Sequence, residues 1–194
     1  MNKKYELTDE TIKFNGKILH HIRALRDFGN VKAGDIGGFI QNETNLSYDG
    51  NCWIYDNARV YGDARVFGNA RVCGNASIYD DALVFGNARV FDNAQVYGNA
   101  QVFDDAWVCY NQSIKKDMIV NSELLSINRS DKYTFTISAA ENNKIVISAG
   151  CRYFESFDDA RNFWTKTRGG TKLGNETMLI LDTLEKYAKL EGMI

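Results

Sequence analysis

The 194-residue chain is 44% hydrophobic, which is enough to bury a core, so a globular protein is expected. Its 23 basic and 25 acidic side chains nearly cancel, which excludes binding to nucleic acid or to an anionic membrane by net charge alone. The polar start of the chain lacks the apolar core of a secretory signal, and no apolar run is long enough to span a bilayer. We therefore expect a cytoplasmic protein without a membrane partner.

The cysteines show neither the paired spacing of a zinc site nor the density of a secreted disulfide scaffold. The four residues are Cys52, Cys73, Cys109 and Cys151. We interpret them as free thiols, and we expect no metal ion and no cofactor.

A hairpin is predicted near the N-terminus, because Asn15-Gly16 separates two alternating runs, TIKF and KILHHI. We assign residues 1–33 to a hairpin cap that protects the first edge of the following repeat, since an open β edge promotes aggregation.

A six-residue repeat follows, running at least from Cys52 to about Lys115 without an insertion. Eleven successive positions six apart, from Ile54 to Ile114, are Val or Ile, and the residue four later is Ala nine times in succession. Within each unit Ala-x-Val-aromatic alternates, so Ala and Val face inward, and Gly, Asn or Asp form a tight corner. Three such sides make a triangular coil of about 18 residues, and stacked coils bury what one hexad cannot.

The same phase continues backward more loosely, with Ile36, Ile40, Leu46 and Tyr48 as candidate inward residues and Gly50-Asn51 as a corner. We therefore predict a β-helix over residues 34–116, with four to five coils.

Residues 117–194 are predicted to form a small α/β domain of a hairpin and two helices. The hairpin is KYTFTISA-AENN-KIVISA. Ser156 is the expected N-cap of a helix that ends at Gly169, and a second helix is expected from about Glu176.

The hexapeptide pattern closely resembles that of left-handed parallel β-helix proteins. Together with LRDFGNVKAGDIGGFIQNETNLSYDGNCWIYDNA, it resembles hexapeptide-repeat proteins of phages, prophages and enteric bacteria, many of them labelled acyltransferases from the repeat alone. The resemblance covers roughly the first 115 residues and implies a mainly β fold and a phage or prophage origin. It supplies no established activity.

Outward side chains form columns, because residues 18 apart lie above one another. One column contains Phe67, Phe85 and Phe103, with Leu83 beside it, and a second contains three tyrosines. On the third side Arg71 and Arg89 lie between Trp53 and Trp107. Stacked Phe rings facing water would be an unusually large apolar patch, so we predict that this Phe column is covered, either by the C-terminal helices or by another subunit of a trimer or dimer. The arginines are spread over three sides, which argues against nucleic acid as a partner.

A candidate ligand site lies between the two C-terminal helices, in the segment TRGGTKLGNET. Its predicted residues are Arg152, Trp164, Arg168, Gly169, Gly170, Thr171 and Lys172. The backbone amides and the dipole of a helix N-terminus favour an anion. The alternative interpretation is an ordinary helix-helix turn with a glycine cap and a core tryptophan.

Two classes of function are consistent with these patterns. The first is a non-catalytic binding protein that occludes a host protein, such as an anti-phage defence protein, or sequesters a small anionic ligand such as a nucleotide. The second is an acyltransferase that uses acyl-CoA, a class that usually has a histidine base. The repeat contains no histidine and no inserted loop, and His20 and His21 lie in the hairpin, so we expect no catalytic residues.

Overall fold

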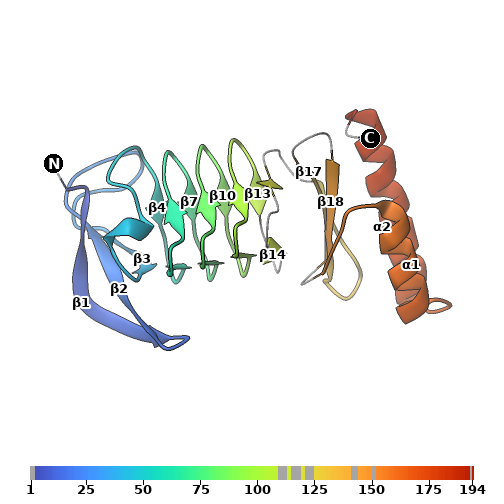
Figure 1. Cartoon of the computed structure of the whole chain (residues 1–194), viewed down its shortest axis with the longest axis horizontal. Coiled ribbons are helices and arrows are strands. Elements are labelled where there is room, and N and C mark those ends of the chain that lie inside the picture. The colour runs from blue at the N-terminus through green and yellow to red at the C-terminus, as the bar shows by residue number, and fades with distance from the viewer. Residues whose placement is uncertain are drawn as a thin grey trace.

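The computed structural model describes residues 3–108, 113–114, 119–120, 125–140, 144–149, 152–192 and 194. Figure 1 shows an elongated molecule, with an N-terminal hairpin, a stack of coils, and a sheet followed by two helices at the opposite end.

The N-terminal hairpin consists of β1 (Tyr5–Phe14) and β2 (Lys17–Ala24), which pair antiparallel. Asn15 and Gly16 both have positive φ, at 46° and 77°, as a tight turn between twisted strands requires. Strand β2 then pairs with β3 (Ile36–Ile40), which also pairs parallel with the first strand of the repeat on its side. The hairpin is therefore continuous with one side of the solenoid.

The repeat folds as predicted into short parallel strands on three sides. The strands are β4 (Trp53–Ile54), β5 (Arg59–Val60), β6 (Arg65–Val66), β7 (Arg71–Val72), β8 (Ser77–Ile78), β9 (Leu83–Val84), β10 (Arg89–Val90), β11 (Gln95–Val96), β12 (Gln101–Val102), β13 (Trp107–Val108), β14 (Ser113–Ile114) and β15 (Ile119–Val120). Each strand pairs with the strand three further along the chain, so that Arg71 lies beside Arg89 and Val72 beside Val90.

The interior contains one Val or Ile and one Ala from each hexad. Val60, Val72 and every repeat alanine from Ala58 to Ala106 are fully buried. Glycine occupies corners where the backbones of successive coils approach closely. Gly74, for example, has a φ of 67°, and a Cβ there would lie 2.9 Å from the amide nitrogen of Asp92 in the next coil. The predicted fold class, a left-handed parallel β-helix with a hairpin cap and a small C-terminal α/β domain, is confirmed in this architecture.

The first coil is looser than the sequence phase predicted. Ile40 pairs with Val60 and Leu46 with Val66, each twenty positions further along, although the short helix η1 (Glu43–Asn45) lies between them. Ile54 pairs with Val72 at the regular eighteen, so the two extra residues widen the corner between Leu46 and Ile54. Ile40 and Leu46 are buried as expected, but the prediction for Ile36 is wrong, since 54% of it is exposed. Extending an 18-residue period across a 20-residue coil assigns Ile36 to the wrong face.

The C-terminal sheet has the strands β16 (Leu125–Asn128), β17 (Thr134–Ala140), β18 (Lys144–Ala149) and β19 (Arg152–Phe154), all antiparallel. The predicted hairpin is its centre, whereas the two outer strands were not predicted. Helix α1 (Phe157–Arg168) begins after Ser156, whose hydroxyl accepts the amide of Asp159. Helix α2 (Lys172–Leu190) begins four residues earlier than predicted, because Thr171 is the N-cap.

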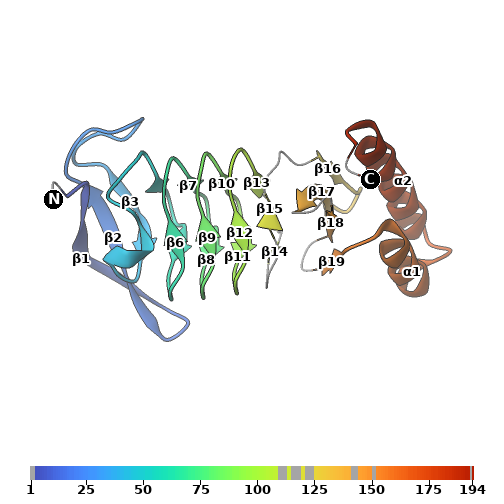
Figure 2. The same ribbon diagram turned by 45° about the horizontal axis from the view of Figure 1, so that its top comes forward.

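The C-terminal sheet closes the far end of the solenoid, with Val146 buried against the solenoid core. The two helices pack on this sheet through a separate core that includes Trp164, Leu181 and Leu184. Figure 2 shows both helices beyond the end of the stack, not along its sides. The C-terminal helices therefore do not cover the Phe column. The boundaries that we draw between the three parts remain predictions.

Within the residues that the structure describes, no helix is both long and apolar enough to cross a bilayer.

Candidate functional site

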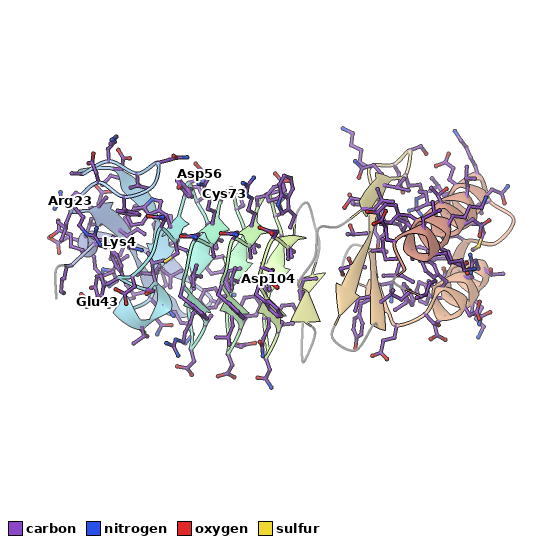
Figure 3. All side chains as sticks on the ribbon, turned by 90° about the horizontal axis from the view of Figure 1, so that it is seen from above. Lys4, Arg23, Glu43, Asp56, Cys73 and Asp104 are labelled. Carbon is purple, nitrogen blue, oxygen red and sulfur yellow. The ribbon has the colours of Figure 1, made fainter. Side chains whose placement is uncertain are left out.

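A groove of about 460 Å³ runs along the side formed by β4, β7, β10 and β13, and we call it the arginine groove. Its lining residues are Asn30, Tyr55, Asp56, Arg71, Cys73, Arg89, Phe91 and Trp107. The volume lies within the range of ligand pockets in proteins. Figure 3 shows Asp56 and Cys73 close together at this edge of the solenoid.

The strand register aligns two arginines in the middle of the groove. Arg71 pairs with Trp53 on one side and with Arg89 on the other, and Arg89 pairs with Trp107. Adjacent strands of a sheet lie about 4.8 Å apart, so the two guanidinium groups start from neighbouring positions. The predicted order of this column is confirmed.

Aromatic side chains limit the groove along the solenoid axis. The guanidinium carbon of Arg89 lies 4.9 Å from the centre of the Trp107 ring, and the rings of Phe91 and Trp107 meet edge to face at 6.1 Å. Trp107 is 39% exposed, which is high for a tryptophan. Apolar ring faces are thus accessible beside a pair of cations.

Two arginines and one carboxylate, that of Asp56, line the groove, and the carboxylate of Asp92 is also near enough to Cys73 to raise the pKa of its thiol. Neither Arg71 nor Arg89 forms an ion pair with any carboxylate in the described part of the chain. Asp56 lines the same groove, and its carboxylate accepts the backbone amide of Gly74 at 3.0 Å. Burial raises the pKa of the Cys73 thiol, so this residue is neutral at physiological pH and does not oppose an anion.

The Phe column forms a regular stack on the side of β6, β9 and β12. The ring centres of Phe67 and Phe85 are 4.8 Å apart, as are those of Phe85 and Phe103, and the planes are nearly parallel. These rings and Leu83 are half-buried within the single chain. Because the C-terminal helices lie elsewhere, another subunit is the remaining predicted cover of the Phe column. This interface stays a prediction.

The Tyr column on the third side is partly covered by the hairpin. Tyr61 is buried, its ring meets that of Phe14 at 5.8 Å, and its hydroxyl accepts from the side-chain amide of Asn15. Tyr79 and Tyr97 continue the stack at 4.9 Å. Of the three columns, the hairpin therefore shields this one.

The residues of the predicted C-terminal site lie in two separate parts of the C-terminal domain. Arg168, Gly169, Gly170, Thr171 and Lys172 form the exposed connection between the helices. In this connection the Thr171 hydroxyl donates to the carbonyl of Arg168 and accepts the amide of Gly174, so side-chain capping satisfies part of the helix N-terminus. The Lys172 ammonium lies 3.8 Å from Glu176.

The other two predicted residues lie on the sheet side of α1. Trp164 is only 4% exposed, and its ring packs against Tyr133 and Phe135 in the core. The guanidinium of Arg152 stacks on Phe163 at 4.4 Å. A ligand role for the seven residues stays a prediction.

Both histidines lie on β2 and bond backbone carbonyls of the two strands beside it, β1 and β3. The Nδ1 atom of His20 bonds the carbonyl of Thr8 at 3.0 Å, and that of His21 bonds the carbonyl of Gly37 at 2.7 Å. His21 also packs on Phe39. Neither histidine lines the arginine groove.

Sequence reasoning placed Arg71, Arg89 and Trp107 in one column but did not recognise a site there. The missed signal was Cys73, the only small residue between the aromatic residues Tyr55 and Phe91 in the neighbouring column. A small residue at a position that elsewhere contains a ring leaves a hollow.

Comparison with known proteins relates the repeat to one solenoid type. A family model described as the YdcK β-solenoid repeat matches residues 54–66, 82–98 and 94–110. A curated relative, the uncharacterized acetyltransferase YdcK of Escherichia coli (strain K12), is 42% identical over 28% of this chain and 19% of its own length. The match thus spans about a fifth of that relative. In its repeat, this chain is a β-solenoid protein similar to YdcK.

Proposed function

We propose that this protein is a non-catalytic binding protein and that the arginine groove holds a small anionic ligand. One observation carries the proposal: Arg71 and Arg89 lie in register without an ion pair among the described residues and line a hollow of about 460 Å³. Paired guanidinium groups suit phosphate and carboxylate groups because each presents several donors in a fixed plane.

The alternative proposal is acyl transfer from acyl-CoA, which the printed name of the E. coli relative suggests. A general base must reach the group that it deprotonates. Here both histidines bond backbone carbonyls of β1 and β3, and neither lines the groove, which favours the binding proposal. Calorimetry with acetyl-CoA tests the alternative: micromolar binding that is lost in His20→Ala or His21→Ala would establish acyl-CoA recognition and overturn the binding proposal.

The resemblance to hexapeptide-repeat proteins of phages and prophages leads to a narrower form of this proposal. In that form the protein is encoded by a phage or prophage and acts by removing an anionic ligand, or by occluding a host protein, in the cytoplasm. Recovery of the chain from infected cells, followed by identification of co-purified small molecules and proteins, tests this form.

Calorimetry with pyrophosphate tests the anion site directly. Arg71→Gln combined with Arg89→Gln should abolish binding and leave the melting temperature unchanged, because Gln95 and Gln101 show that glutamine fits the same repeat position. Arg65→Gln, on another side of the solenoid, is the matched control and should bind normally. Arg168→Gln examines the predicted C-terminal site: loss of binding in this variant alone would move the site to the helix connection.

A further inference from the structure

We propose that the arginine groove is a nucleotide site, in which a planar base stacks between Tyr55 and Phe91 while its phosphate binds Arg71 and Arg89. This inference rests on the proposed anion-binding function and names the ligand class. It starts from a difference between the aromatic columns of the solenoid.

Two columns contain a ring in three successive coils. The Phe rings repeat at 4.8 Å, and the Tyr rings at 5.2 and 4.9 Å. The third column reads Tyr55, Cys73, Phe91 and Cys109 in the sequence, so the coil between Tyr55 and Phe91 contributes a small thiol instead of a ring. Because each coil adds about 4.8 Å, Tyr55 and Phe91 are separated by about 9.6 Å, the space that one further ring occupies in the other columns. All three residues line the groove.

The cations lie at a suitable distance from this gap. Arg71 is two residues before Cys73 on the same strand path, which places their backbones about 6.6 Å apart. A base in the gap therefore leaves room for a sugar before the phosphate reaches the two guanidinium groups. A simple inorganic anion would use the arginines alone, whereas a nucleotide uses the arginines and the gap together.

The neutral state of Cys73 favours the same ligand. Burial is the main cause that raises the pKa of this thiol, and an uncharged sulfur is a compatible floor for an aromatic ring. Asp56 also lines the groove. Its carboxylate accepts a hydrogen bond from the Gly74 amide, and this bond weakens its electrostatic repulsion of a phosphate.

The test uses the full-length chain and calorimetric titration with adenosine 5′-monophosphate, ribose 5-phosphate and adenosine. Cys73→Phe fills the gap with the ring that the neighbouring columns already accept, so its melting temperature should be equal to or above that of the wild type. We expect it to weaken adenosine 5′-monophosphate binding about tenfold or more, the worth of one base-stacking contact, and to leave ribose 5-phosphate binding unchanged. Cys73→Leu fills the gap without a ring and provides the same measurement if the phenylalanine variant fails to fold.

The outcomes separate the two proposals. Unchanged binding of adenosine 5′-monophosphate in both Cys73 variants would overturn the nucleotide site, and so would a wild-type affinity no higher than that for ribose 5-phosphate. In either case pyrophosphate binding that depends on Arg71 and Arg89 would preserve the anion site. Absence of binding for every phosphate-bearing probe would overturn both.

Discussion

Alanine sets the cross-section of the solenoid. Each repeat alanine is fully buried and lies just after a corner, where the chain turns towards the next side. The inward valines fill the interior between these corners, so no larger side chain fits at the alanine position without moving a neighbouring coil.

Replacing Ala82 by leucine should therefore overpack one corner. We expect a loss of about 1–3 kcal/mol in the free energy of unfolding, measured by chemical denaturation. Gln95→Leu, which adds the same side chain at an exposed outward position, is the control and should change stability little. Equal stability of the two variants would show that the alanine position is not constrained.

Lys4 is a buried cation at the first coil. Its ammonium donates to the carbonyl of Cys52 at 2.9 Å, lies 3.3 Å from the Cys52 sulfur, and sits 4.9 Å from the centre of the Phe28 ring. No ion pair of this residue is found among the described residues. Burial is the main cause that lowers the pKa of Lys4 below 10.5, because the charged form loses its water.

A lowered lysine pKa makes stability depend on pH. Below 10.5 the unfolded chain holds the Lys4 proton more tightly than the folded chain, so the contribution of Lys4 to stability rises as pH increases towards that value. We expect the difference in unfolding free energy between wild type and Lys4→Met to shift in favour of the wild type as pH rises towards 10.5. Urea denaturation at each pH measures it. A difference that stays constant or moves the other way would contradict the lowered pKa.

The Cys52 thiol acts in the opposite direction as the pH rises above 9.0. Burial raises the pKa of Cys52 above 9.0, so the folded chain keeps this proton while the unfolded chain releases it. Cys52→Ala in both backgrounds removes this second contribution.

Among the elements, the Phe column is an uncovered apolar stack on a sheet whose other face is the core. Its three rings are half-buried in one chain, and the C-terminal helices pack elsewhere. We propose that a second or third copy of the chain covers it, since a stack of this kind favours association.

Changing Phe85 to lysine should dissociate this oligomer without unfolding the chain, because the ring lies outside the solenoid interior. Light scattering coupled to size exclusion gives the mass, and the melting temperature reports the fold. Gln95→Lys introduces the same charge on another side and should keep the wild-type mass. A monomeric wild type would contradict the proposed oligomer.

Regularity decided which elements could be predicted. The inward valines, the alanines, the Asn15-Gly16 turn and the Ser156 cap follow from local patterns, and the structure confirms each of them. The face of Ile36 depended on the widened corner between Leu46 and Ile54, and the start of α2 depended on capping by Thr171. Neither feature has a periodic signal. Cys109 and Cys151 lie outside the described residues, so the prediction for them stays open.

The candidate site was only partly predictable for a similar reason. The column of Arg71 and Arg89 follows from the period. The hollow beside it results from one missing ring and from Asn30, which belongs to the loop between β2 and β3 and not to a hexad. Such a combination becomes visible only when the coils and the loop are placed together.

At the scale of the whole molecule, the solenoid has two differently built ends. The hairpin extends one sheet at the start, and the C-terminal sheet packs Val146 onto the interior at the finish. Both arrangements protect strands that would otherwise present unpaired amides and carbonyls. The hairpin continues into the side of β5, and β17 of the C-terminal sheet contacts β15 on another side.

Because the strands are equally spaced, each added hexad turns the chain by one third of a revolution, and each added coil of three hexads lengthens the solenoid by one layer. Duplicating the coil from 73 to 90 moves the C-terminal sheet outward by one layer and returns it to the same orientation, so the longer chain should melt cooperatively. Duplicating only the six residues from 85 to 90 turns that sheet by one third of a revolution and sets it against the wrong side. We expect the six-residue insertion to melt lower than the eighteen-residue one in calorimetry, so that the larger change to the sequence is the smaller change to the protein.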